Sequence, residues 1–418
     1  MNQLKLSTSL KTEASNQGRG LLSVKISILL SFFLCLGSMF PFLSPYPINT
    51  DTQPIAHFFA VLVVFYIFIQ KGLSREEIFL ILFSIFTLFY FNPFTGGNVD
   101  MGKYLSLTLG ILIFVAFRHT SSNLIWSVVK FAIFAYFFAS IIISIVPNHA
   151  LTIQSYFVRE INVAEFGHDA FAYRGVPALA TEPGLLGGLL IFLMIQVKYF
   201  QNKFSIPQNR ILLFYFLLFV TILMTRSGTG YLYFFMFFII SWFDYSSNKV
   251  RDGSILLVLI VLCGYALGYV AETIGINNRG LEILYGISSG QTFGQDTSVL
   301  KRIFDVSIGL ISLVQNPFGV GVNNVTGAVN DIAVQFGLLR EVDYSREIEL
   351  VSGFGWMCVS FGIPGFLFIM YIFIFLSKAP FVHKVFAFIF FSISYSPAFP
   401  AIWILLAQSV SDKKSKLQ

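Results

Sequence analysis

Long apolar runs separated by short polar segments dominate the chain. A helix needs roughly 20 mostly apolar residues to span the hydrocarbon core of a membrane. The runs that approach this length, which we interpret as spans, are residues 24–43, 55–70, 77–92, 103–117, 124–146, 184–200, 210–225, 229–243, 254–272 and 351–376. The pattern predicts an all-α polytopic membrane protein, with residues 1–418 forming a single integral membrane domain.

The last apolar stretch, residues 380–410, is long for one helix and short for two, and Pro397 and Pro400 interrupt it. Lys and Arg collect in short cytoplasmic loops. With a cytoplasmic N-terminus and alternating spans, 18 of the 27 Lys and Arg fall on the inner side. A hairpin that turns near the two prolines keeps the basic C-terminal residues inside as well. We therefore expect about 12 transmembrane helices with both termini cytoplasmic.

Two long segments fall on the outer side of this topology, residues 147–183 and residues 273–350. Within the second, residues 299–315 have apolar positions at helical spacing and one polar face, so we expect a helix lying along the membrane surface. Of the 21 Asp and Glu, 15 lie on the outer side. Any chemistry is therefore expected at the outer face.

Composition and charge narrow the class of protein further. Hydrophobic residues make up 56% of the chain and charged residues 11%, whereas soluble domains carry roughly 25% charged residues. The net charge of +6 comes from basic inner loops, and no basic run with interleaved aromatic residues points to nucleic acid. The three cysteines, Cys35, Cys263 and Cys358, lie inside apolar runs, so we interpret them as packing residues.

Signatures of several other chemistries are missing from the sequence. There is no GxxxxGK[ST] motif of an ATP-driven pump and no HExxH motif of a zinc protease. No two of the five histidines have metal-ligand spacing, so neither a metal nor another cofactor is predicted. The predicted spans hold few ionisable residues, which disfavours an ion-coupled transporter. A flippase for lipid-linked glycans stays open.

The first candidate site lies just before the sixth span. Pro183 suits the first turn of a helix, and Glu182 suits the positive end of the helix dipole. Arg174 is a candidate phosphate ligand because a guanidinium group binds phosphate oxygens with two hydrogen bonds. Glu182 is then a candidate proton acceptor. The alternative is that Glu182 only caps the helix and that Arg174 only pairs with it.

The second candidate site is a tight turn at residues 225–230, with the sequence Thr-Arg-Ser-Gly-Thr-Gly. Glycines allow the chain to reverse, and their exposed N–H groups can hold an anion. Arg226, Ser227 and Gly228 are therefore predicted to bind substrate. The alternative for Arg226 is a long side chain that reaches the membrane surface from a helix end.

The remaining candidates lie in the two outer segments. Arg302 is followed by Asp305 and by a Gly-rich turn that ends at Asn323, a further candidate for substrate binding. A surface ion pair between Arg302 and Asp305 is the alternative.

The acidic segment before residue 350 supplies a second candidate proton acceptor, Glu349, and a substrate-binding candidate, Arg346. Both residues could instead belong to a solvated surface. Arg159, in the first outer segment, is the last candidate ligand of the substrate.

These motifs, in this order, resemble those of the O-antigen polymerase and O-antigen ligase superfamily of bacterial envelope proteins. The resemblance extends over most of the chain, with about a dozen spans and two long outer segments. The local matches are residues 181–187, residues 225–230, Arg302 with residues 316–321, and Ser352 with residues 362–365. The ligase branch carries a His near the end of the large outer loop, whereas this chain has no His in residues 273–350. The resemblance thus favours the polymerase (Wzy-type) branch.

One departure concerns Gly184, which stands where the family usually has Ser after Glu-Pro and leaves the role of Glu182 open. The resemblance implies a GT-C-like architecture in the bacterial cytoplasmic (inner) membrane. It also implies a metal-independent glycosyltransferase that polymerises undecaprenyl-pyrophosphate-linked repeat units for lipopolysaccharide O-antigen, capsule or exopolysaccharide. Arg174, Arg302, Glu182 and Glu349 are the implied catalytic residues.

The implied partners are lipid-linked glycans, membrane lipids, a chain-length regulator and a flippase, but no nucleic acid. Three alternatives remain at this point. The first is a ligase that transfers glycan to the lipid A core, and the second is a flippase or other transporter. The third is a metal-dependent glycosyltransferase that uses Glu341 and Asp343.

Overall fold

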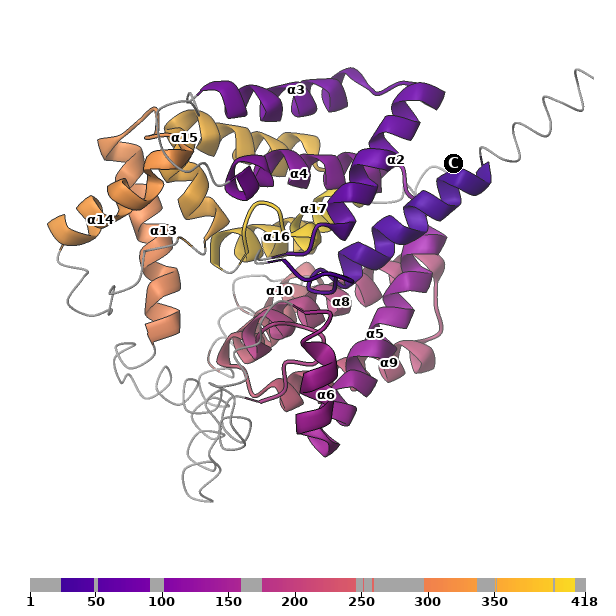
Figure 1. Cartoon of the computed structure of the whole chain (residues 1–418). Coiled ribbons are helices and arrows are strands. Elements are labelled where there is room, and N and C mark those ends of the chain that lie inside the picture. Colours follow the sequence, from indigo (N-terminus) through magenta and orange to yellow (C-terminus); the bar gives the residue numbers. More distant parts are fainter. Residues whose placement is uncertain are drawn as a thin grey trace, which may run out of the picture.

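Helices make up most of the residues that the computed structural model describes (Figure 1). The structure describes residues 24–48, 52–90, 101–158, 175–245, 251, 258, 297–336, 350, 352–393 and 395–409. Within these ranges the β pairing is limited to an isolated bridge between Leu43 and Val158. The described residues therefore confirm the expected all-α class.

The first half of the chain forms a helix over Val24–Met39 followed by α2 (Ile55–Lys71), α3 (Arg75–Tyr90), α4 (Met101–Arg118), α5 (Ser122–Ile145), α6 (Pro147–Gln154), α8 (Pro183–Phe204), α9 (Gln208–Thr225) and α10 (Gly228–Tyr245). The second half forms α13 (Thr297–Gln315), the short η2 (Val322–Asn324), α14 (Val325–Gln335), α15 (Gly353–Tyr371) with the π-helical turn η4 (Ile372–Leu376), α16 (Phe381–Ile393) and α17 (Pro400–Ala407). Nine of the predicted spans thus have helices close to their expected bounds. The predicted span 254–272 lies outside the described residues apart from Val258.

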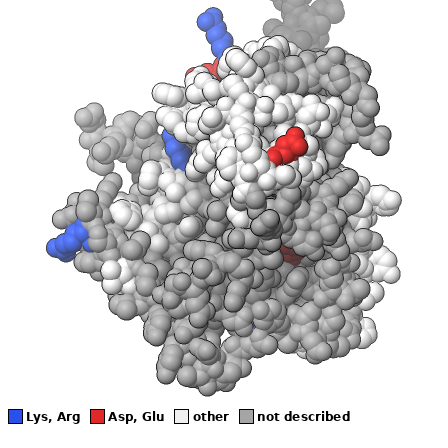
Figure 2. Space-filling model, turned by 90° about the vertical axis from the view of Figure 1, so that its left-hand side faces the viewer, with Lys and Arg blue, Asp and Glu red and all other residues white. Residues whose placement is uncertain are grey.

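Four of the described helices are long and apolar enough to cross a membrane: Ser122–Ile145, Pro183–Phe204, Gln208–Thr225 and Gly353–Leu376. Several helices expose rows of large apolar side chains, such as Phe58, Phe65 and Phe68 on α2. Figure 2 shows few charged side chains among the described residues of one face. These surfaces fit a lipid environment, so the protein is an apolar helical membrane protein. The number of spans and the side on which each terminus lies stay predictions.

Helix α8 lies at the centre of the bundle and buries most of its side chains. It packs against α9 and α10, and two glycines bring it unusually close to α10. A Cβ atom added to Gly187 would lie 2.5 Å from the Cα of Gly230. Small residues at such a crossing let two helix backbones approach closely in a membrane protein. The contact joins Gly187, in the second turn of α8, to Gly230, in the first turn of α10.

The first outer segment is tied to the bundle on both sides of its undescribed part. After α6, the backbone N–H of Ser44 donates to Phe157 O over 2.8 Å. The Gln154 side chain donates to Ala180 O over 3.1 Å, just before α8. These contacts hold the entrance to α8 against the end of the first helix.

Helices α13 and α15 pack side by side in the same direction. A Cβ atom on Gly309 would lie 2.8 Å from the Cα of Gly355, so the two backbones are in close contact. In Figure 1, α13 runs across the direction of α3 and α4. Whether it lies along a membrane surface, as expected for residues 299–315, stays a prediction.

Helix α15 is broken at Gly362, which has φ 59° and ψ −146°. The break leaves carbonyl groups of α15 without N–H partners in the helix, and the Gly-rich turn after α13 supplies those N–H partners. Val320 N donates to Val359 O over 2.9 Å, and Gly321 N donates to Ser360 O over 3.0 Å. In return, Ile363 N donates to Pro317 O over 2.8 Å. The turn that the sequence assigned to a binding site is thus the structural partner of a helix break.

Helices α16 and α17 form a hairpin whose start and end meet, because Ser377 Oγ donates to Leu406 O over 2.7 Å. At about 1.5 Å per residue, α16 is about 20 Å long and α17 about 12 Å, both shorter than the hydrocarbon core of a bilayer. The hairpin turns at residues 395–399, near the predicted prolines, but Tyr395 and Phe399 at this tip are buried. The sequence predicts a hairpin that turns near these prolines, and the two helices do form a hairpin, with its tip packed inside the protein. That the hairpin counts as two membrane spans stays a prediction.

Gly362 generates a test of the α15 break. Gly362→Ala should lower the melting temperature of the purified protein, because a φ of 59° with a ψ of −146° costs an L-residue roughly 1–3 kcal/mol. The new Cβ would also lie 2.3 Å from Pro317 O. Gly327→Ala on α14 is the matched control, since a Cβ there meets nothing within 4 Å. Equal melting temperatures for the two variants would contradict the role assigned to the break.

Candidate functional site

The first two sequence motifs lie side by side in the structure. Glu182 occupies the N-cap position of α8 with φ −142° and ψ 148°, but its side chain makes no capping hydrogen bond and is exposed. Ser227 precedes α10, and its Oγ accepts a hydrogen bond from Gly230 N over 3.2 Å. A Cβ atom on Gly184 would lie 3.7 Å from that Oγ. The N-terminal ends of α8 and α10 therefore meet, and the Glu182 carboxylate is not used to cap its helix.

Arg226 is held in an unusual backbone conformation between α9 and α10. Its φ of 47° and ψ of 25° lie in the left-handed region, which costs a residue with a Cβ roughly 1–2 kcal/mol. The buried Thr225 fixes this turn, because its Oγ1 donates to Ile222 O over 2.7 Å and accepts from Ser227 N over 3.3 Å. The half-buried Arg226 side chain is thus set beside Ser227 by a rigid turn.

The end of the first outer segment packs on this same turn. Gly175 has φ 84°, and a Cβ there would lie 2.1 Å from Thr225 O. Val176 N donates to Met224 O over 3.0 Å. Four predicted site residues lie outside the described residues: Arg159, Arg174, Arg346 and Glu349.

The third motif is anchored to a distant helix. Asp305 is buried, and its Oδ2 accepts a hydrogen bond from Ser352 N over 3.2 Å. Ser352 caps α15, with its Oγ accepting from Gly355 N over 2.9 Å. The Asp305 carboxylate therefore lies inside the protein and not on a solvated surface. It ties α13 to the start of α15, one turn from the half-buried Arg302.

Tyr395, at the tip of the α16–α17 hairpin, connects these motifs and was missed in the sequence. Its phenol donates to Leu185 O in the first turn of α8 over 2.9 Å. Its backbone carbonyl lies against the start of α15, because a Cβ on Gly353 would lie 2.8 Å from Tyr395 O. Gly188 leaves room for the phenol, because a Cβ there would lie 2.1 Å from the phenol oxygen. The only signal in the sequence was the polar pair around Tyr395 inside an apolar stretch, Ser394 and Ser396.

Three helix N-termini gather around this tyrosine. The Leu185 carbonyl in the first turn of α8 accepts a hydrogen bond from the phenol, and α10 begins beside α8. Helix α15 begins against the backbone of the tyrosine, because a Cβ on Gly353 would lie 2.8 Å from Tyr395 O. A helix N-terminus carries partial positive charge and exposed N–H groups, which favour anions. With Arg226 and Arg302 close by, this end of the bundle is suited to an anionic group.

Among the candidate site residues that the structure describes, Asn323 lies away from the three helix N-termini around Tyr395. It is exposed and follows the far end of α13. Because Arg302 lies near the start of that helix, 14 residues before Asn316, helical rise separates the two ends by about 20 Å. Its prediction as a substrate ligand rested on closeness in sequence alone. Among the residues that the structure describes, no group of three His, Cys, Asp or Glu side chains could hold a metal ion.

No protein-family model, no curated protein and no solved structure matches this chain. Its chemistry must therefore be argued from its own residues and their arrangement.

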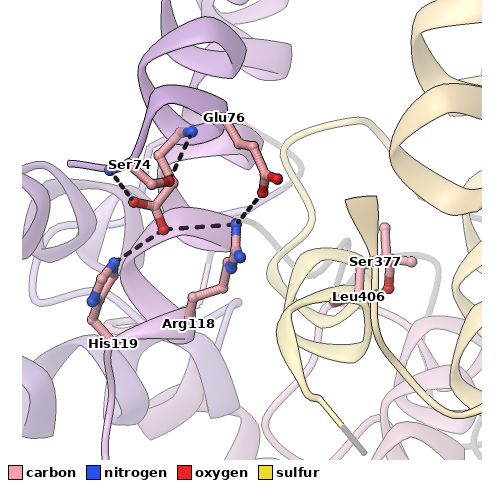
Figure 3. Close-up of polar contacts among 7 residues, drawn as sticks. Ser74, Glu76, Arg118, His119, Ser377 and Leu406 are labelled. Atoms are coloured by element: carbon pink, nitrogen blue, oxygen red, sulfur yellow. Dashed lines mark hydrogen bonds and ion pairs between the residues drawn. The ribbon is translucent and has the colours of Figure 1, made fainter. Parts of the chain in front are cut away.

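A second polar cluster lies at the opposite end of α2 from the hairpin tip. Ser74 and Glu77 cap α3 reciprocally: Ser74 N donates to Glu77 Oε2 over 2.9 Å, and Glu77 N donates to Ser74 Oγ over 3.3 Å. His119 Nε2 lies 3.0 Å from Glu77 Oε1, and Arg118 Nη1 lies 3.7 Å from the same oxygen (Figure 3). The cluster fastens α3 to the end of α4.

Glu77 generates a stability prediction. Its side chain is 4% exposed and accepts from both His119 and Ser74, so Glu77→Gln should lower the free energy of unfolding by about 1.5–3 kcal/mol, the usual value for hydrogen bonds to a charged group. Glu76→Gln is the control, because Glu76 is 59% exposed and 3.9 Å from Arg118, and should change it by less than about 1 kcal/mol. Detergent-purified protein unfolded with SDS provides the measurement. Equal losses of unfolding free energy in the two variants would contradict the conclusion that Glu77 is the residue that stabilises this cluster.

Proposed function

We propose that the protein is a glycosyltransferase that polymerises polyprenyl-pyrophosphate-linked oligosaccharide repeat units at the outer face of the bacterial cytoplasmic membrane. One observation carries the proposal. Motifs separated by about 45 to 120 residues in the sequence come together at one end of the bundle, around Arg226, Arg302 and three helix N-termini. An anionic, lipid-linked substrate requires this combination of positive charge and apolar surroundings.

The chemistry needs no nucleotide, because the bond between the glycan and pyrophosphate is already activated. The acceptor hydroxyl oxygen forms a bond to the anomeric carbon of the donor, and the bond from that carbon to the pyrophosphate oxygen breaks. The polyprenyl pyrophosphate leaves with the bonding electron pair. Arg226 and Arg302 stabilise the negative charge that develops on it, with Arg174 as a third candidate.

A carboxylate takes the proton of the acceptor hydroxyl as the new bond forms. Glu182 fits this role because its side chain is exposed at the start of α8 and is not engaged as a helix cap. Glu349, the other candidate, lies outside the described residues.

The strained backbone of Arg226 supports a functional role for this residue. A left-handed conformation is usually taken by Gly or Asn, which adopt it at little cost. Strained backbone of this kind clusters at active sites and ligand clamps, where a side chain must be held for function. The left-handed conformation therefore makes the folded protein less stable, and it fixes the position of the Arg226 guanidinium group beside Ser227.

The departure at Gly184 from the family pattern also has a physical account. A Cβ atom at this position would make ordinary contact with Ser227 Oγ. A serine hydroxyl thus already stands in the corner that a larger side chain at position 184 would enter. Ser227 supplies from α10 the hydroxyl that the family pattern would supply from α8.

Arginine replacements test the proposal in a strain that lacks its own copy of the protein. Arg302→Ala or Arg226→Ala should abolish long polysaccharide chains on an electrophoretic ladder while single repeats persist, because removal of one charge-stabilising group costs a rate factor of roughly 10² or more. Arg210→Ala is the matched control, since Arg210 is exposed at the opposite end of α9.

The outcome separates the competing functions. Wild-type ladders from both variants would overturn the proposal. Loss of all glycan on the final lipid, including single repeats, would indicate the ligase instead. Loss of activity on EDTA treatment would favour the metal-dependent glycosyltransferase, and accumulation of untransported lipid-linked repeats would favour the flippase.

A further inference from the structure

Helix α8 has two glycines in its first two turns that differ in what surrounds them. A Cβ atom on Gly187 would lie 2.5 Å from Gly230 Cα, so packing excludes any side chain there. Gly184 has no such neighbour in the part of the chain that the structure describes. There, the atom within 4 Å of its added Cβ is Ser227 Oγ, at 3.7 Å, which is ordinary contact. Packing among the described residues therefore leaves room for a side chain at position 184.

The backbone conformation does not require glycine at position 184 either. Gly184 is the second residue of α8, and its φ does not lie in the positive region, where Gly175 and Gly362 lie. Glycine is less favourable than alanine within a helix, because it loses more conformational freedom on folding. Gly184 thus makes the first turn of α8 less stable than alanine would. A glycine of this kind is typical of a position where a ligand comes close to the backbone.

Two polar side chains border the space beside Gly184. Glu182, two residues before it, is exposed and makes no capping hydrogen bond. Ser227 Oγ accepts a hydrogen bond from Gly230 N over 3.2 Å, and a hydroxyl group that accepts a hydrogen bond still has a proton to donate. A carboxylate that accepts and a hydroxyl that donates together suit the hydroxyl groups of a sugar, which do both.

The Glu182 carboxylate also indicates which part of the substrate the space does not hold. A diphosphate beside Gly184 would lie close to a charge of the same sign, and the two would repel each other more strongly than in bulk water. A sugar ring is free of this repulsion. In the proposed reaction, Glu182 takes the proton of the acceptor hydroxyl, so the sugar that comes close to it is the acceptor sugar.

We propose that Gly184 is a specificity-determining residue, which keeps the space beside Glu182 and Ser227 Oγ open for the acceptor sugar ring of the lipid-linked repeat unit. The inference rests on the proposed function, since it assigns part of that site to one of the two substrates. A side chain at position 184 would occupy space that the ring needs. The same side chain would leave the fold of α8 intact.

Gly184→Ala tests the inference because activity and stability should change independently. The full chain is purified in detergent and given lipid-linked repeat units extracted from cells that lack the protein. The variant should polymerise them with a kcat/KM lowered about tenfold or more, the effect of one methyl-sized group in a substrate pocket. Its melting temperature should equal or exceed that of the wild type, because alanine favours the helix.

Two further measurements locate the effect. Gly327→Ala on α14 is the matched control, since a Cβ there meets nothing within 4 Å either, and it should leave kcat/KM unchanged. Geranylgeranyl pyrophosphate, which carries a diphosphate but no sugar, should bind equally to the wild type and to Gly184→Ala.

The results distinguish the inference from the proposed function. A wild-type protein that does not polymerise the extracted repeat units would overturn the proposed function and the inference with it. An active wild type with an equally active Gly184→Ala variant would overturn the inference alone. A lower melting temperature that accompanies the loss of activity would also overturn it, since Gly184 would then serve the fold. Weaker binding of geranylgeranyl pyrophosphate to Gly184→Ala would overturn it too, since the space would then hold the diphosphate.

Discussion

Every backbone N–H and C=O group that lies within a membrane must find its partner inside the protein, because the lipid offers none. In the part of the chain that the structure describes, this constraint governs two places where helices are interrupted. At Gly362 the carbonyl groups freed in α15 are bound by the turn that follows α13. At residues 395–399 the indole of Trp403 and the imidazole of His57 bind the freed carbonyl groups. The helix interruptions are stable because the freed carbonyl groups find hydrogen-bond donors, which come from other segments of the chain.

The interruptions in turn create the candidate site. Without the turn at residues 395–399, the last apolar stretch would continue as a helix and its tyrosine would lie among lipid-facing or packing side chains. The turn instead brings Tyr395 between the start of α8 and the start of α15. Helix packing supplies the rest, since the contact of Gly187 with Gly230 sets two helix N-termini side by side. Anion-binding character thus arises from how the helices begin and end, more than from their number of charges.

Local pattern predicted the parts of the structure that depend on local physics. Hydrophobic runs located the helices within a few residues, Pro183 marked the start of α8, and Arg226 with its glycines marked a tight turn. Contacts between distant residues could not be predicted in this way. The bond from Tyr395 to Leu185 joins residues 210 positions apart, and that from Ser352 to Asp305 joins residues 47 apart. For the same reason the sequence could not show how far Asn323 lies from Arg302, since nearness in sequence hides the length of the helix between them.

The hairpin also has a consequence for biosynthesis. Its tip needs His57 from the second helix, and its base needs Gln196 and Tyr199 from α8, so it can pack only after those helices are inserted. Arg302 emerges from the ribosome some 90 residues before Tyr395. A chain whose synthesis stops before the hairpin would insert most of its helices and carry its arginines, yet lack the element that joins the start of α8 to the start of α15. Assembly of the site is therefore coupled to completion of translation, and a prematurely terminated chain is a membrane protein without a finished site.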